Sequence, residues 1–148
     1  MGNLLKLLFL KEIAGVGNAK INKNYLSIII EGVDLKALET KVMANVAVGE
    51  DSVKIAAEKA TEMSERIEKD DDIRYLTVLD KEYPGNLKLL GNRKPVLLYY
   101  KGNVELLKYP SVAVVGTRKQ SEYVLLSGLL SLLSFQSSAQ KQKPKKGI

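Results

Sequence analysis

The 148-residue chain contains no cysteine, no histidine and no tryptophan. Without cysteine it has no disulfide framework and no thiolate ligand, and without histidine a typical zinc or iron site lacks its donors. The Ser-His and Cys-His pairs that activate most protein nucleophiles are also impossible within this chain. These absences exclude most hydrolase classes, and we expect no catalytic residue, no metal site and no cofactor.

Long apolar segments are missing too. The apolar stretch at residues 4–10 is interrupted by Lys6 and is not followed by a small-residue cleavage site, so it does not resemble a secretory signal. The leucine-rich stretch at residues 124–135 is shorter than the roughly 20 residues that a membrane-spanning helix needs. We therefore expect a cytoplasmic protein.

The net charge of +6 is unevenly distributed along the chain. Residues 41–72 carry five basic and nine acidic side chains, whereas residues 73–148 carry thirteen basic and four acidic ones. A basic C-terminal half favours a polyanionic partner. The alternative interpretation is a lysine-rich surface that only keeps the chain soluble.

The first half of the chain has the apolar spacing of helices. Residues 3–14, 19–30, 35–46 and 53–67 each show it, with Asn18, Asp34 and either Asp51 or Ser52 as expected N-caps and with Ile55 and Met63 on the apolar face of the fourth helix. Asp70-Asp71-Asp72 ends this half. Consecutive carboxylates lack the alternating spacing of a calcium loop, so we interpret them as a helix end and linker.

After residue 72 the pattern changes to short strands at residues 74–79, 95–101 and 112–115, with helical turns at 87–90 and 104–107. Helices followed by an α/β pattern indicate two units. From residue 134 the sequence is polar, basic and of low complexity, which predicts disorder. The expected domains are a helical one at 1–72, an α/β one at 73–133 and a basic tail at 134–148.

The third predicted strand opens into a polar turn that suits a phosphate group. Gly116 allows close approach of the backbone, Thr117 offers a hydroxyl and an amide, and Arg118 can bind a phosphate with two parallel hydrogen bonds. Lys119 adds charge and Ser121 can cap a following helix. The pattern is neither a Rossmann fingerprint nor a Walker loop. The alternative is an ordinary strand-to-helix turn with an exposed arginine.

A second candidate is Gly15-Val16-Gly17, which has the form of a helix-hairpin-helix turn. In that motif the turn's amides face a DNA phosphate, and Lys20 and Lys23 would add charge. The alternative is an αα-corner that needs glycine for its backbone angles. We interpret Gly15, Gly17 and Lys20 as a possible secondary DNA contact.

Tyrosines alternate with cations in the second half, an arrangement that can stack the bases of a single strand. They are Tyr99, Tyr100, Tyr109 and Tyr123, and the cations are Lys94, Lys101, Lys108 and Arg118. The alternative is core packing, and we expect at least one of Tyr99 and Tyr100 in the core because neighbours on a strand point to opposite faces. Tyr83-Pro84 predicts a structural corner.

Two stretches together resemble the DNA-processing protein A (DprA/Smf) family: YPGNLKLLGNRKPVLLYYKGNVELL from Tyr83, and PSVAVVGTRKQSEY from Pro110. The shared order is a Tyr-Pro pair, a leucine-rich turn, Pro-Val-Leu-x-Tyr, Lys-Gly-Asn and a strand ending in Gly-Thr/Ser-Arg. The upstream Gly-Val-Gly helix pair is similar to the N-terminal helical domain of that family. The resemblance covers residues 4–123, and residues 83–123 carry its specificity.

The resemblance implies a non-catalytic protein that binds single-stranded DNA, protects incoming strands in natural transformation and helps to load a recombinase. It implies an α+β or α/β fold, with a helical domain of the SAM or helix-hairpin-helix kind followed by a Rossmann-like domain, and a possible homodimer. Gly116, Thr117 and Arg118 would form the phosphate site. Lys119, Ser121 and Tyr123 lie in the same motif and would belong to the same DNA- or phosphate-binding site.

The chain departs from the family pattern at Val124, where the family has glycine. Residues 125–129 (LLSGL) are similar to the family's second turn but come far too early. We therefore expect an incomplete, truncated Rossmann-like domain with impaired DNA binding. One hypothesis for this ending is an internal deletion followed by a frame change. The alternatives are a nucleotide-phosphate-binding enzyme fragment, for which Asp80, Glu82, Glu105 and Glu122 form no recognisable pair, and a non-catalytic helical protein-interaction module.

Overall fold

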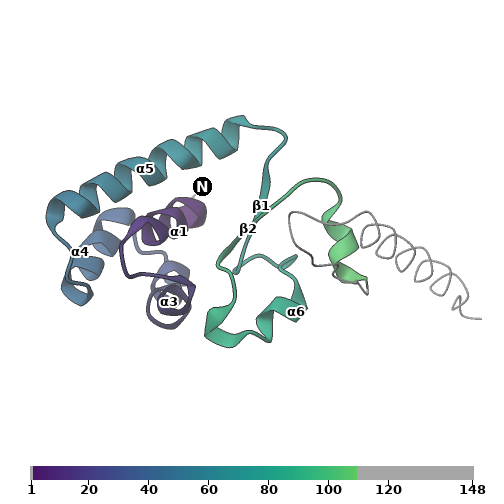
Figure 1. Cartoon of the computed structure of the whole chain (residues 1–148), viewed down its shortest axis with the longest axis horizontal. Coiled ribbons are helices and arrows are strands. Elements are labelled where there is room, and N and C mark those ends of the chain that lie inside the picture. The colour runs from purple at the N-terminus through teal and green to yellow at the C-terminus, as the bar shows by residue number, and fades with distance from the viewer. Residues whose placement is uncertain (1, 110–148) are drawn as a thin grey trace, which may run out of the picture. The chain divides into compact units, whose positions relative to one another are not determined.

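The structure, a computed structural model, describes residues 2–109, and residues 1 and 110–148 lie outside the description (Figure 1). The described elements, in chain order, are α1 (Gly2–Glu12), α2 (Asn18–Lys20), the π-helical η1 (Ile21–Tyr25), α3 (Leu26–Ile30), α4 (Leu35–Asn45), α5 (Glu50–Lys69), β1 (Arg74–Thr77), α6 (Gly85–Lys88), the 3₁₀-helical η2 (Gly91–Arg93), β2 (Leu97–Tyr100) and the 3₁₀-helical η3 (Val104–Lys108). The expected mix of helix and strand is confirmed for this part of the chain. The predicted strand at 112–115 lies outside it.

Helix α1 is the centre of the helical part. Its buried side chains are Leu4, Leu7, Leu8, Phe9 and Leu10, which cover most of its circumference, so the helix is surrounded by other elements. The long α5 lies along it (Figure 1). The result is a leucine-rich core helix that the other helices enclose.

Helix α5 packs through small residues. Its buried positions are Val53, Ala56, Ala60 and Ser64, three or four residues apart, and such a stripe lets α5 approach α1 closely. The prediction that Ile55 and Met63 belong to the same apolar face is wrong. They are 51% and 40% exposed, because the helical spacing that buries the alanines turns these two side chains away from α1.

The predicted helix at 19–30 is present as the consecutive segments α2, η1 and α3. Ile21, Tyr25 and Ile29 are buried as expected. The π-helical turn coincides with Asn22, whose side-chain amide donates to the Asn18 carbonyl at 2.9 Å. In a regular α-helix that carbonyl would accept the backbone N–H of residue 22. The hydrogen bond from the Asn22 side chain to the Asn18 carbonyl therefore occurs where the helix changes from α to π geometry.

One of the predicted helix caps is correct. The Asp34 carboxylate accepts the backbone N–H of Ala37 at 2.8 Å and so caps α4. The other caps are wrong, because α2 begins after Gly17 and α5 after Gly49, neither with a side-chain cap bond. Asn18 thus lies within the first turn, where its Oδ1 accepts the Val96 N–H at 3.4 Å. Asp51 and Ser52 likewise lie inside α5.

Strands β1 and β2 pair antiparallel, with Arg74 opposite Tyr100 and Thr77 opposite Leu97. The turn after β1 is closed by Asp80, whose Oδ2 accepts the backbone N–H of Thr77 at 2.6 Å and its hydroxyl at 2.9 Å. A further bond from the Val78 N–H to the Val96 carbonyl (3.0 Å) continues the pairing. Leu76, Thr77 and Leu97 are buried, so the inner end of this ribbon joins the core.

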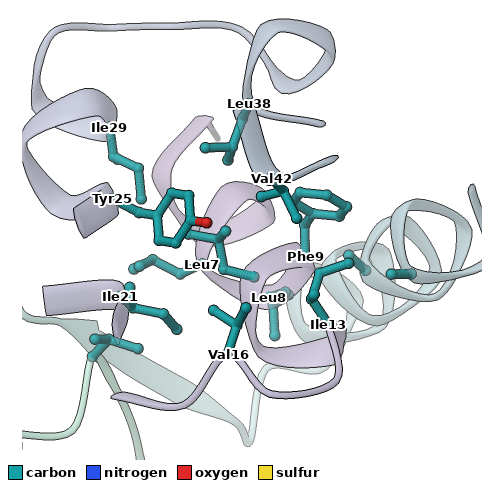
Figure 2. Close-up of a cluster of buried hydrophobic side chains, with 14 of the residues drawn as sticks. Leu7, Leu8, Phe9, Ile13, Val16, Ile21, Tyr25, Ile29, Leu38 and Val42 are labelled. Atoms are coloured by element: carbon teal, nitrogen blue, oxygen red, sulfur yellow. The ribbon is translucent and has the colours of Figure 1, made fainter. Parts of the chain in front are cut away.

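The hydrophobic core joins the helices to the ribbon. Side chains from α1, the helical stretch 18–30 and α4 gather in one cluster (Figure 2), and Val96 and Leu97 belong to that cluster. Residues 2–109 accordingly group in one compact unit. The core therefore crosses residue 72, and the predicted domain division there stays a prediction. Within residues 2–109, no helix combines the length and the apolar character needed to cross a membrane.

Candidate nucleic-acid interface

The main predicted site lies outside the described residues. Gly116, Thr117 and Arg118, together with Lys119, Ser121 and Tyr123, all follow residue 109, so the structure says nothing of their geometry. The described residues do include the second candidate, Gly15, Gly17 and Lys20, and the tyrosines Tyr99, Tyr100 and Tyr109.

The Gly-Val-Gly turn joins α1 to α2, and its two glycines differ. Gly15 has φ +77°, a left-handed conformation that favours glycine, and the buried Val16 that follows donates its N–H to the Ile13 carbonyl at 3.1 Å. Gly17 is extended, with φ −92°, and a Cβ there would meet no heavy atom within 4 Å. The corner interpretation explains Gly15 in full. Gly17 is the N-cap residue of α2, and glycine is among the residues accepted at that position. The space beside its backbone is open.

Two asparagines fasten the helix after this turn to a loop far along the chain. The Asn22 side-chain nitrogen donates to the carbonyls of Asn92 (3.0 Å) and Lys94 (2.8 Å), and Asn18 accepts the N–H of Val96. The Asn22 Oδ1 is buried without a hydrogen-bond partner. We call Asn18 and Asn22 the asparagine clamp. The clamp places Arg93 and Lys94 beside the helix that carries Lys20.

Sequence reasoning missed this clamp. It interpreted Asn18 as a cap and assigned no role to Asn22. The available signal was the spacing of four residues between two asparagines, which puts both on one face of a helix. Nothing in the sequence identifies the carbonyls of residues 92 and 94 as the partners, because a backbone acceptor carries no residue-specific signature.

Two of the predicted tyrosines line an open groove of about 900 Å³ where α5 ends beside β2. Its apolar lining is Met63, Ile67 and Ile73, its aromatic lining Tyr99 and Tyr100, its cations Arg66, Lys69 and Lys101, and its carboxylates Asp70, Asp71 and Asp72. The expectation that one of the two tyrosines packs in the core is wrong, because Leu97, at the inner end of β2, enters the core instead. Partial burial still raises the pKa of Tyr99.

The charges of this groove balance. Three cations face three carboxylates, and Lys101 Nζ lies 3.8 Å from Asp72 Oδ2, with both side chains largely exposed. An exposed pair of this kind contributes little to stability. The aspartates end α5: Asp70 is its C-cap residue and accepts the Asp72 N–H at 3.0 Å. Because its charges balance, the groove offers aromatic surface without a net attraction for a polyanion. No cluster that could hold a metal ion occurs among residues 2–109.

Tyr83 forms the expected structural corner. Its side chain is buried, and its hydroxyl donates to the Pro95 carbonyl at 2.7 Å. Burial raises the pKa of this tyrosine. Tyr83 thus ties the start of the loop that contains α6 and η2 to the end of that loop, next to the residues that the asparagine clamp holds.

Comparison with known proteins gives a match to a protein family for part of the chain. Residues 74–133 match the family described as DNA recombination-mediator protein A. At the level of a single relative, the chain is 52% identical over 46 residues to the DNA processing protein DprA of Streptococcus pneumoniae (strain ATCC BAA-255 / R6). The predicted resemblance is confirmed for residues 74–133, and its extension to the helical first half stays a prediction. The aligned stretch covers 31% of this chain and 16% of that relative. No solved structure matches.

Proposed function

We propose that this chain binds single-stranded DNA in DNA processing during natural transformation and helps to load a recombinase onto it. The observation that carries the proposal is the match of residues 74–133 to a family of recombination mediators, because that stretch contains Gly116, Thr117 and Arg118. The relative from Streptococcus pneumoniae carries the name of a DNA processing protein. The basic charge of residues 73–148 supports the same kind of ligand.

The proposed binding is electrostatic and independent of base sequence. Arg118 would place two parallel hydrogen bonds on one phosphate, Lys119 would add charge, and the amides at Gly116 and Thr117 would donate to phosphate oxygens. Such contacts release counterions from the strand, so affinity falls as salt rises. The mechanism needs no bond cleavage and therefore no catalytic residue.

We also propose that the second half continues as the Rossmann-like domain of this family and that the first half is its helix-hairpin-helix or SAM-like domain. The described strands pair antiparallel, so a parallel sheet would have to begin with the predicted strand at 112–115. A homodimer and a recombinase are the protein partners that this assignment adds.

The test is a double substitution in the predicted phosphate loop. Arg118→Ala with Lys119→Ala should raise the dissociation constant for a fluorescein-labelled deoxythymidine oligonucleotide by about ten-fold or more, because each charge-assisted hydrogen bond is worth about 1.5–3 kcal/mol. Fluorescence polarisation over a salt series measures both affinity and salt dependence. The matched control is Lys36→Ala with Lys41→Ala, which removes the same charge from two exposed positions on α4.

Equal effects of the two double substitutions would remove the loop from the account and leave only net charge. Duplex DNA and a nucleoside triphosphate serve as competitors in the same assay. Tighter binding of the nucleotide than of the single strand would favour the nucleotide-binding alternative instead.

A further inference from the structure

We propose that the chain has a second contact for the single-stranded DNA backbone: a basic patch made of Lys20 and Lys23 from the helix and Arg93 and Lys94 from the loop. We call these four residues the clamped patch. Its ligand rests on the proposed function, but its location and composition come from the described residues. It shares no residue with the predicted phosphate loop at Gly116 to Arg118.

The clamped patch lies where two carboxylate-free segments meet. Residues 13–30 contain no Asp or Glu, and neither do residues 83–104. In the structure α2 packs against η2, as does η1, with Cα atoms within 8 Å. All side-chain charges that these two segments bring together are therefore positive. The arrangement combines residues more than 70 positions apart, so it is visible only in the folded chain.

The asparagine clamp fixes the relative position of the two segments. Asn22 lies between Lys20 and Lys23 in sequence and donates to the backbone carbonyls on either side of Arg93. These bonds join the Asn22 side chain to backbone carbonyls, so they do not involve the cationic side chains of either segment. A loop fixed in this way does not have to be ordered when a ligand binds, which lowers the entropic cost of binding.

The cations of the patch are not neutralised within the described structure. Lys20, Lys23 and Arg93 are exposed and Lys94 is half-buried. The ion pairs among residues 2–109 use other cations: Lys54 with Glu50, Lys69 with Glu65 and Lys101 with Asp72. The patch thus differs from the groove beside β2, where three carboxylates offset three cations.

The composition of the patch indicates phosphates rather than bases as its target. Its members are all cations, and the nearest aromatic of the helix, Tyr25, is 1% exposed and so cannot stack a base. Lysine and arginine without an aromatic partner bind the backbone and give no base specificity. Four such contacts on a single strand would add about 2.8 to the slope of log affinity against log salt.

The direct test is Lys20→Ala with Arg93→Ala, one cation from each segment. We expect the dissociation constant for the single-stranded oligonucleotide to rise several-fold at low salt and the salt slope to fall by about 1.4, as for two lost phosphate contacts. The control is again Lys36→Ala with Lys41→Ala. Equal losses of affinity and slope in the two variants would overturn the proposal.

A second variant tests the clamp without changing any charge. Asn22→Ala removes the bonds to residues 92 and 94 while all four cations remain. We expect weaker binding than in the unmodified chain, with circular dichroism at 222 nm confirming that the helices are retained. Unchanged affinity in a folded Asn22→Ala variant would show that the clamp does not organise the patch. Where this variant fails to fold, the charge variant decides.

The outcomes separate this inference from the proposed phosphate loop. Loss of binding in the Lys20/Arg93 variant with none in the Arg118/Lys119 variant would support the patch and overturn the loop. The reverse result would overturn the patch and leave the proposed function intact. An unmodified chain that binds no single-stranded DNA would overturn both.

Discussion

Single polar side chains hold the described part of the chain together over long sequence distances. Tyr83 reaches the Pro95 carbonyl, and Asn22 reaches the carbonyls of Asn92 and Lys94. The loop between β1 and β2 is therefore fixed at both of its ends by side chains rather than by regular secondary structure. Burial of Tyr83, and of Tyr25 in the core, raises their pKa values.

Those raised pKa values make a prediction about alkaline stability. A tyrosine whose pKa in the folded chain exceeds its unfolded value of about 10 holds its proton longer when folded, so the stabilisation is complete below pH 10 and is lost as pH rises through the folded value. Tyr83→Phe should lower the free energy of unfolding by about 1 kcal/mol at pH 7, through the lost hydrogen bond. It should also reduce the decline above pH 10. Urea denaturation followed by circular dichroism at several pH values measures both.

The matched control for this prediction is Tyr109→Phe, at a tyrosine that is 67% exposed. Because this side chain is largely exposed, the substitution should leave the free energy of unfolding at pH 7 unchanged. A Tyr83→Phe variant with the same neutral stability and the same alkaline decline as the unmodified chain would contradict the role assigned to this hydroxyl.

At the scale of elements, periodicity was a good guide to helices and a poor one to their ends and faces. The four helical stretches and both strands before residue 104 are present, since apolar spacing reflects the burial that forms them. The predicted caps at Asn18 and at Asp51 or Ser52 are wrong because the N-cap residues are Gly17 and Gly49, so each helix begins before its predicted cap. A sequence window cannot show where the first helical turn begins.

The predictions of which side chains are buried on α5 and β2 are wrong for a different reason. Ile55 and Met63 satisfy the helical spacing loosely, but close packing against α1 selects the alanine stripe of α5. For Tyr99 and Tyr100, alternation along the strand predicts that the two side chains point to opposite faces of the sheet. It does not predict whether other elements pack on either face. The asparagine clamp depends on contacts between residues more than 70 positions apart, which no local pattern encodes.

The cap assignments give a prediction at the scale of one helix. Asp34→Ala should lower the free energy of unfolding by about 0.5–2 kcal/mol, because the N–H of Ala37 loses its acceptor. Ser52→Ala should be neutral or slightly stabilising, since Ser52 is exposed within α5 and alanine has the higher helix propensity. Thermal unfolding of the two variants side by side checks the pair. A larger loss for Ser52→Ala than for Asp34→Ala would reverse the assignment.

At the scale of the whole molecule, charge is separated between segments that share one core. Residues 41–72 are rich in carboxylates, while residues 13–30 and 83–104 have none. Val96 and Leu97 nevertheless pack in the same cluster as α1 and α4. The fold therefore brings the carboxylate-free segments together at the asparagine clamp, and this supports a polyanionic partner independently of the match to a recombination-mediator family.

The measurement that tests the central claim most directly is the affinity of the unmodified chain for a single-stranded oligonucleotide across a salt series. We predict that the logarithm of the association constant falls linearly with the logarithm of salt concentration, with a slope of about −0.7 for each phosphate contacted. Several contacts give a steep line that is independent of base sequence. Binding that is absent at low salt, or that does not change with salt, would contradict the account.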